Sequence, residues 1–267
     1  MNCSSTSHCA GVARGARCSP AHPPSRSTLT DTQVVSIPRK SDFSLDEEAI
    51  LARVAQGDID YAILTSPNNP TGNTTSPAFI EKLLETSDTL IMVDEAYGEF
   101  GGESMIPYLD RYPNLVVLKT FSKAYALAGV RLGYVLANPQ VIREFIKVRQ
   151  PYSVDAVSQA IGMTVYENRA LLEPGIEAIK HERTVLHEEL AALPGAEVYP
   201  SHANFILVRI PHAHRIWEQL LERGILVRDF SSAPSLENCL RITIGTEEEN
   251  RALIEALHEL TANPDNT

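Results

Sequence analysis

Cysteine is scarce in this chain, and most of it lies in one place. The 267 residues include four cysteines, of which Cys3, Cys9 and Cys18 fall near the N-terminus while Cys239 stands alone. No CxxC pair and no Cys/His spacing typical of a metal site occurs. We therefore expect neither a disulfide framework nor a structural metal ion.

Long apolar runs and an excess of positive charge are missing as well. No stretch approaches the roughly 18 consecutive apolar residues that a membrane-spanning helix needs. The N-terminus has no apolar core of the kind found in secretory signal peptides, so we expect a cytoplasmic protein. The formal net charge is −11. This charge argues against nucleic acid or an anionic membrane as the main partner, because both repel an acidic surface.

Three regions can be distinguished along the chain. Apolar residues make up 43% of the sequence and charged residues 21%, as in an ordinary globular protein of one large or two smaller domains. Residues 1–33 are rich in Ser, Pro, Cys, His and Arg and lack hydrophobic periodicity, so we expect a disordered or aberrant segment. We interpret residues 34–150 as a larger domain and residues 151–267 as a linker helix with a smaller domain.

Short strands and helices alternate within the larger domain. Apolar runs that predict buried strands occur at 61–65, 90–93, 115–119 and 133–137. Helices are predicted to begin at Ser76 and Asn138, each of which is followed by proline. Another is predicted over 44–55, with a capping box of Ser44 and Glu47. This alternation predicts an α/β fold with a mostly parallel sheet.

The smaller domain has a different pattern. Residues 153–193 predict a long helical tract that bends around Pro174 and Gly175. The pattern then predicts a strand at 204–209, a helix at 212–223, short strands near 225–228 and 240–244, and a last helix capped by Thr246 and Glu249. These elements together predict an α+β domain.

Polar loops follow three of the predicted strands of the larger domain. They read SPNNPTGN (66–73), DEAYGEF (94–100) and TFSKAYALAGVR (120–131). Taken singly, they suggest a plain turn at Asn69, a structural salt bridge at Asp94 and a surface lysine at Lys123. Ligands bind at the carboxyl ends of parallel strands, so we expect the three loops to meet at one site.

The residue types at this edge suit one cofactor. An acid such as Asp94 at the end of a buried strand needs a cationic partner, and a protonated ring nitrogen would serve. A partly buried lysine has a lowered pKa and can form a Schiff base, which is the role we expect for Lys123. Hydroxyls and an arginine suit a phosphate dianion; here they are Thr120, Ser122 and Arg131. Pyridoxal 5′-phosphate requires this set of groups.

The spaced motifs NNPTG, DEAY and SKAYALAGVRLGY resemble those of the fold-type-I aminotransferases. The stretch VRDFSSAPSLENCLRITIGTEEEN (227–250) is similar in particular to the histidinol-phosphate aminotransferase family. The resemblance runs from about residue 34 to about residue 260. It implies a pyridoxal-phosphate domain, incomplete here, followed by a smaller α+β domain.

The resemblance also implies roles for individual residues. Lys123 would form the imine with the cofactor and shuttle the proton, and Asp94 would pair with the ring nitrogen. Asn69 and Tyr97 would hydrogen-bond the ring hydroxyl. The cofactor phosphate would be held by Thr120, Ser122 and Arg131.

Two arginines of the smaller domain are implied to bind substrate. Arg241 stands where general aminotransferases grip a carboxylate, and in this family it would meet the phosphate of histidinol phosphate, with Arg228 as a second clamp. Pairing with surface acids is the simpler alternative for both. The implied reaction exchanges an amino group between histidinol phosphate and 2-oxoglutarate in histidine biosynthesis, and the implied assembly is a homodimer.

Parts of the family pattern have no match in this sequence. An N-terminal arm, a phosphate-binding Gly-x-Asp-Glu turn and an aromatic residue over the ring are expected before residue 34 and are not visible. Two alternatives to an active enzyme of this type follow: an aromatic or threonine-phosphate type relative, or an inactive remnant. We also hypothesise that residues 1–33 are a frame-shifted segment, which the nucleotide sequence of the gene would test.

Overall fold

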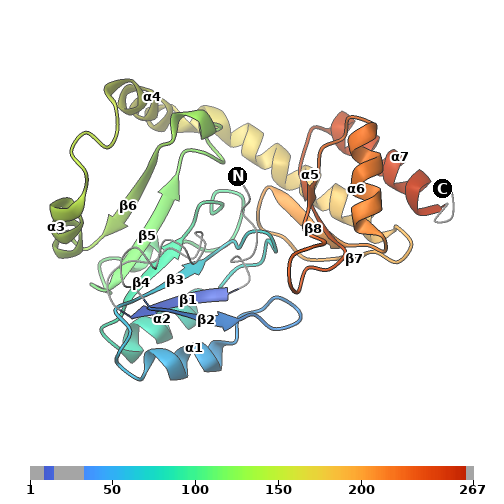
Figure 1. The fold of residues 1–267 in the computed structure, drawn as a ribbon. Coiled ribbons are helices and arrows are strands. Elements are labelled where there is room, and N and C mark those ends of the chain that lie inside the picture. Colours follow the sequence, from blue (N-terminus) through green and yellow to red (C-terminus); the bar gives the residue numbers. More distant parts are fainter. Residues whose placement is uncertain (1–8, 15–32, 263–267) are drawn as a thin grey trace.

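The computed structural model describes residues 9–14 and 33–262, which form two domains (Figure 1). The N-terminal domain contains a six-stranded sheet and the C-terminal domain a four-stranded sheet. The helix α5 (Glu173–Ala191) is the longest of the described helices and leads from one domain into the other (Figure 1). None of the helices within these residues is long and apolar enough to cross a membrane.

The large sheet has a parallel centre and antiparallel flanks. Its strands are β1 (Cys9–Arg14), β2 (Gln33–Pro38), β3 (Tyr61–Thr65), β4 (Leu90–Asp94), β5 (Leu115–Thr120) and β6 (Gly133–Ala137), in the spatial order β2-β1-β3-β4-β5-β6. β3, β4 and β5 run parallel, while β1, β2 and β6 pair antiparallel with their neighbours. The segment between β5 and β6 holds only one short helix, η4 (Ala128–Val130), and no crossover helix, so β6 returns antiparallel. The predicted α/β class is confirmed.

Strand β1 differs from what the sequence led us to expect. It lies inside residues 1–33, for which regular structure was not predicted, and it pairs through its backbone with β2 and β3. The rest of that segment, 1–8 and 15–32, lies outside the described residues, and the frame-shift hypothesis stays untested.

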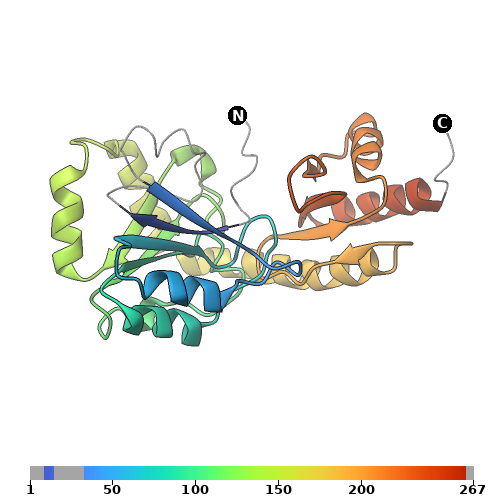
Figure 2. The same cartoon turned by 60° about the horizontal axis from the view of Figure 1, so that its bottom comes forward.

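Two helices cover one face of the large sheet. α1 (Glu47–Val54) and α2 (Pro77–Thr86) lie side by side against it (Figure 2). Their buried side chains pack on those of β3, β4 and β5, which together form the core of the domain: Ile50, Val54, Ile80, Leu83, Leu64, Ile91, Val93, Leu115 and Val117. The buried, β-branched character of the central strands is typical of strands covered by helices.

The helix caps confirm two predictions and correct one. Ser76 accepts a hydrogen bond from Phe79 N at 3.3 Å, and Asn138 caps α3 (Pro139–Val148) in the same manner. The predicted capping box of α1 is wrong. The hydroxyl of Ser44 donates to Asp42 Oδ1 at 2.7 Å, and Asp46 caps the helix by accepting from Ala49 N at 3.1 Å.

The far end of the large domain exposes apolar side chains. The helix α4 (Ala156–Glu167) follows α3, and among its side chains Val157 and Met163 are 68% and 64% exposed. Further exposed apolar residues of β6, α3, α4 and the segments beside them are Val135, Ile146, Val148, Tyr152, Ile161, Tyr166 and Leu171. Several exposed apolar side chains on neighbouring elements are typical of a place where another surface packs.

The link to the small domain breaks slightly earlier than the sequence suggested. α4 ends at Glu167, and the short helix η5 (Arg169–Leu172) separates it from α5. Pro174 then occupies the first turn of α5, where its missing N–H is not needed. The bend therefore lies at Asn168–Leu172, before Pro174 and Gly175.

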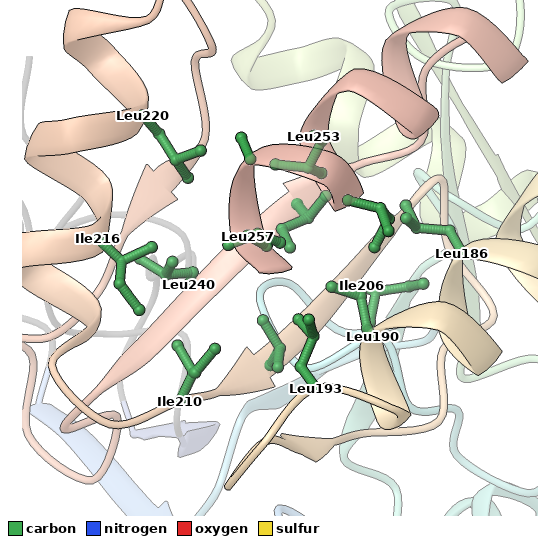
Figure 3. Close-up of a cluster of buried hydrophobic side chains, with 14 of the residues drawn as sticks. Leu186, Leu190, Leu193, Ile206, Ile210, Ile216, Leu220, Leu240, Leu253 and Leu257 are labelled. Carbon is green, nitrogen blue, oxygen red and sulfur yellow. The ribbon is translucent and has the colours of Figure 1, made fainter. Parts of the chain in front are cut away.

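The small domain packs three helices on one face of an antiparallel sheet. The strands β7 (Glu197–Val198), β8 (Phe205–Arg209), β9 (Arg228–Asp229) and β10 (Cys239–Thr243) follow the spatial order β7-β8-β10-β9. α5, α6 (Ala213–Glu222) and α7 (Glu247–Ala262) bury Leu186, Leu190, Ile216, Leu220, Leu253 and Leu257 against Ile206 and Leu240 (Figure 3). The predicted cap of the last helix is confirmed by reciprocal bonds between Thr246 and Glu249.

Candidate functional site

The loop after β3 is held against the small domain. Gly72 adopts φ +76°, and a Cβ at this position would lie 2.3 Å from Ser201 Oγ. His202 N donates to Gly72 O at 2.8 Å. Glycine is therefore required here both for its left-handed backbone and for its lack of a side chain. The close approach brings Asn69, in the same loop, next to the small domain.

Asn69 meets one of the two predicted substrate arginines. Arg241, on β10, donates from Nη1 to Asn69 Oδ1 at 2.7 Å. Since a guanidinium can only donate, the amide oxygen is the atom engaged and the amide NH₂ is left to donate elsewhere.

The loop after β4 supplies the predicted acid and phenol. Asp94 ends β4, and its Oδ1 accepts a hydrogen bond from Ala96 N at 3.0 Å. Burial raises the pKa of the Asp94 carboxyl, although that hydrogen bond and the nearby Lys123 act in the opposite direction. The buried ring of Tyr97 packs edge-on against Phe205, with ring centroids 5.1 Å apart. This loop therefore also reaches the small domain.

The structure places Lys123 close to these groups. Its Nζ lies 5.1 Å from the centroid of the Tyr97 ring, and its charge lowers the pKa of Asp94. The chain turns back directly after this residue, with Ala126 N donating to Lys123 O at 3.0 Å. The predicted lysine, acid and phenol thus lie at one edge of the sheet, as the strand-end rule required.

The predicted phosphate ligands are only partly assembled. At the end of β5, Ser122 N donates to Thr120 Oγ1 at 3.1 Å, and the Thr120 hydroxyl donates to Leu132 O at 3.3 Å. Arg131 adopts φ +58° and donates to Ala128 O at 2.9 Å within its own loop. Within residues 33–262, no hydrogen bond joins Arg131 to Thr120 or Ser122. Their joint role stays a prediction.

The two predicted substrate arginines are neighbours in the small sheet. Arg241 and Arg228 are paired in register on β10 and β9. The Arg241 guanidinium lies 5.0 Å from the Phe205 ring centroid and 5.9 Å from that of Phe230. Its Nε is buried without a hydrogen-bond partner, and burial lowers its pKa, with Arg228 acting in the same direction.

No acid neutralises Arg241 in the part of the chain that the structure describes. A partly buried cation beside a second cation is costly unless an anion joins them. The pair therefore has the chemistry of an anion site. Its role in binding substrate stays a prediction.

Some residues of the site were not found from the sequence. Phe205 and Phe230 flank Arg241, but no motif singled them out because apolar residues in strands and loops are common. Lys119 lies between Glu95 and Glu99, directly behind Asp94 and Tyr97. The sequence offered a signal for this cluster: two acids four residues apart in DEAYGEF, and a lysine within an apolar strand. The described residues hold no group of three or more His, Cys, Asp or Glu that could bind a metal ion.

Comparison with known proteins identifies the class. The family model "Aminotransferase class I and II" matches residues 19–257. The chain belongs to this family, and the predicted family and its cofactor, pyridoxal phosphate, are confirmed at that level.

The similar proteins point to one kind of aminotransferase. The histidinol-phosphate aminotransferase of Chlorobaculum tepidum is 39% identical over 233 residues, which are 87% of this chain and 67% of that protein. Histidinol-phosphate aminotransferase 1 of Carboxydothermus hydrogenoformans is 45% identical over 233 residues, 87% of this chain and 66% of that protein. The chain thus spans about two thirds of the length of these relatives.

A solved structure supports the fold. The histidinol-phosphate aminotransferase of Sinorhizobium meliloti, in complex with pyridoxal-5′-phosphate, matches with a TM-score of 0.74 at 30% identity. The match covers 86% of this chain and 64% of that one. The predicted fold type is therefore confirmed for the part of the fold that this chain contains.

The residues at the site fit this cofactor in part. The buried Asp94 carboxyl, whose pKa burial raises, is suited to a cationic ring nitrogen, and the free amide NH₂ of Asn69 is suited to a ring oxygen. Lys123 offers an amine near Asp94 and the Tyr97 ring. For the phosphate, the described residues offer the Thr120–Ser122 turn, so the ring end of the cofactor is better provided for than its phosphate end.

Proposed function

We propose that this protein transfers an amino group between histidinol phosphate and 2-oxoglutarate with pyridoxal phosphate as cofactor. The observation that carries the proposal is that Lys123, Asp94 and Tyr97 lie at one edge of the large sheet, and that Arg241 of the small sheet reaches the loop after β3 by its hydrogen bond to Asn69. The similarity to histidinol-phosphate aminotransferases over most of the chain supports this choice of substrate.

The chemistry divides between cofactor and protein. Pyridoxal phosphate, when bound, supplies an aldehyde and an electron-poor ring that stabilises negative charge on the adjoining substrate carbon. Asp94 would keep the ring nitrogen protonated, and its burial would strengthen that interaction because the local dielectric constant is low. Asn69 would donate from its NH₂ and Tyr97 from its hydroxyl to the ring oxygen.

Lys123 has two tasks in this proposal. Its Nζ would hold the cofactor and, once displaced by the substrate amine, would take the proton from the substrate carbon that carries the amino group. Lys123 would then return that proton one position away, which is the proton movement that amino-group transfer requires before water releases the product.

Arg241 and Arg228 select the substrate. Histidinol phosphate carries a phosphate in place of the carboxylate of an ordinary amino acid, and a dianion between two in-register guanidinium groups makes charge-assisted hydrogen bonds. The Phe205 and Phe230 rings hold the Arg241 guanidinium in place by cation–π contact. 2-Oxoglutarate would use the same cations through a carboxylate.

We also propose that the protein works as a homodimer in the cytoplasm. The exposed apolar side chains of β6, α3 and α4 support the dimer, because a surface of this kind is costly to leave in water. Light scattering on the purified protein tests the oligomeric state, and cell fractionation tests the location.

The central experiment uses purified protein, with and without pyridoxal phosphate. Binding is expected to produce absorbance near ~420 nm, typical of a lysine–pyridoxal imine, and to raise the melting temperature. Glutamate should then form from histidinol phosphate and 2-oxoglutarate. Faster turnover of phenylalanine or O-phosphothreonine would favour the aromatic or threonine-phosphate alternative. A colourless protein with no change in melting temperature would identify an inactive remnant.

A further inference from the structure

A buried ion cluster lies behind the candidate site and has no part in the chemistry described so far. The ammonium of Lys119, on β5, is 3.2 Å from Glu95 Oε2 and 3.1 Å from Glu99 Oε1. The three side chains are only 8%, 2% and 15% exposed. Both acids belong to the loop after β4, the loop that carries Asp94 and Tyr97.

The cluster is strongly coupled to its surroundings. Glu95 accepts hydrogen bonds from Met105 N and from the Ser104 hydroxyl, both at 2.7 Å. Burial pulls the pKa of Lys119 down, but Glu99 and Glu95 outweigh it and leave the pKa raised. Lys119 is therefore firmly charged, and it is the only cation in contact with either carboxylate within residues 33–262. Without it, two carboxylates would remain buried and unpaired.

The residues of the cluster are close in sequence to the residues of the site. Glu95 follows Asp94 directly, and Glu99 lies two residues after Tyr97, so the two ion pairs flank Tyr97 and begin at the residue next to Asp94. Lys119 precedes Thr120, and the strand leads from there to Lys123. Successive residues of a strand point to opposite faces of the sheet. Lys119 can therefore contact the loop on one face while Thr120 points to the other.

The backbone of the loop is shaped around this lysine. A Cβ at Gly98 would lie 3.0 Å from Lys119 Nζ and 3.2 Å from Glu95 O. Gly98 N donates to Glu95 O, and Phe100 N donates to Tyr97 O, so the loop forms consecutive tight turns above the ammonium. Glu95 N also donates to Leu118 O, the residue before Lys119. The loop and the strand are thus joined by both main chain and side chain.

We propose that Lys119 is a positioning residue, which clamps the loop after β4 through Glu95 and Glu99 and so fixes Asp94 and Tyr97 relative to Lys123. The proposal rests on the proposed function for its effect on the cofactor, while the clamp itself is a property of the cofactor-free chain. Burial, and to a smaller extent the nearby Glu99, raises the pKa of Tyr125 and of Tyr134, but neither carries a positive charge that could replace the lysine.

The test compares Lys119→Met with Lys147→Met. Lys147 pairs with Glu144 on the surface of α3, where both side chains are 66% exposed, so its loss is a matched control. Hydrogen exchange of the cofactor-free chains measures the clamp. We expect faster exchange over residues 94–105 in Lys119→Met and unchanged exchange in the control. Equal exchange in the two variants would overturn the proposal.

Titration with pyridoxal phosphate measures the consequence for the site. We expect about tenfold weaker binding to Lys119→Met, because a loop that samples other conformations lowers the population able to bind. The pH midpoint of the bound-cofactor absorbance should also move upward, since a ring held less firmly by Asp94 withdraws less charge. A lower melting temperature with an unmoved affinity and midpoint would mean a merely structural role and would overturn the positioning role.

A second variant protects the test against misfolding. Glu99→Gln leaves Lys119 and Glu95 as a neutral pair, so the fold should persist. We expect faster exchange confined to residues 97–101 and a smaller loss of cofactor affinity, and unchanged exchange there would contradict the clamp. If the wild-type chain binds no cofactor, the proposed function fails, and the exchange measurements still decide whether Lys119 holds the loop.

Discussion

Arg241 and Asn69 lie 172 positions apart in the sequence, yet Nη1 of the arginine donates to Oδ1 of the asparagine at 2.7 Å. The bond joins β10 of the small domain to the loop after β3 of the large domain. It engages the amide oxygen of Asn69, so the Asn69 NH₂ and the rest of the Arg241 guanidinium can still donate to other groups. One contact thus couples the residue proposed to hold the cofactor ring to the residue proposed to hold the substrate.

Replacing Arg241 should mainly weaken substrate binding. Arg241→Met removes charge-assisted hydrogen bonds worth about 1.5–3 kcal/mol each, so the KM for histidinol phosphate should rise roughly 10- to 100-fold, with a smaller change in kcat. Arg223→Met is the control, because Arg223 pairs with Glu259 at the surface. Steady-state kinetics on both variants make the measurement. An unchanged KM in Arg241→Met would show that the phosphate binds elsewhere.

Removing the amine of Lys123 should abolish transamination and leave the fold intact. The side chain of Lys123 is exposed in the cofactor-free chain, so Lys123→Ala costs little packing. Absorbance near ~420 nm should disappear while cofactor still binds non-covalently, which equilibrium dialysis would detect. Lys180→Ala, which breaks only an exposed pair with Glu177, should behave as wild type. Full turnover by Lys123→Ala would refute the assignment.

The charge of Asp94 should destabilise the cofactor-free chain. Burial raises its pKa above the ordinary 3.8, so the folded state binds a proton more readily than the unfolded state. The free energy of unfolding should therefore fall as pH rises from about 3.8 through the folded-state pKa, and stay level above it. Asp94→Asn keeps the oxygen that accepts from Ala96 N and removes the charge.

Asp94→Asn should consequently melt at a higher temperature than wild type at pH 7 when no cofactor is present. The difference should vanish as pH falls below the ordinary pKa of the carboxyl. Added pyridoxal phosphate should raise the melting temperature of the variant less than that of wild type, because the ring nitrogen loses its acid. Calorimetry with and without cofactor measures both effects, and a variant that gains as much from cofactor as wild type would contradict the role of Asp94.

Local sequence patterns predicted what depends on local physics. The strands at 61–65, 90–93 and 115–119, the Ser76 and Asn138 caps and the reciprocal cap at Thr246 follow from apolar runs and capping chemistry. Because parallel strands end at one edge, the same patterns also brought the loops after β3, β4 and β5 together. The family motifs assigned those loops their roles, and composition alone did not.

The remainder depends on contacts that no local pattern encodes. The antiparallel direction of β6 follows from the lack of a crossover helix between β5 and β6. Asp46 caps α1 because the Ser44 hydroxyl is hydrogen-bonded to Asp42. The bond between Arg241 and Asn69 needs two domains to meet, and so does the packing of Tyr97 on Phe205. In the sequence, Lys119, Glu95 and Glu99 are three charged residues without a shared motif, and only the fold brings them together in a buried cluster.

The core of the small domain should be the part most sensitive to cavity formation. Leu190, on α5, is fully buried among Leu186, Leu193, Ile206 and Leu257 (Figure 3). Leu190→Ala should lower the free energy of unfolding by about 2–5 kcal/mol, because the rigid helices around it cannot close the space. Leu226→Ala removes the same atoms from a side chain that is 79% exposed and should cost less than about 0.5 kcal/mol. Urea unfolding followed by circular dichroism compares the two, and equal losses would mean that α5 does not pack in this core.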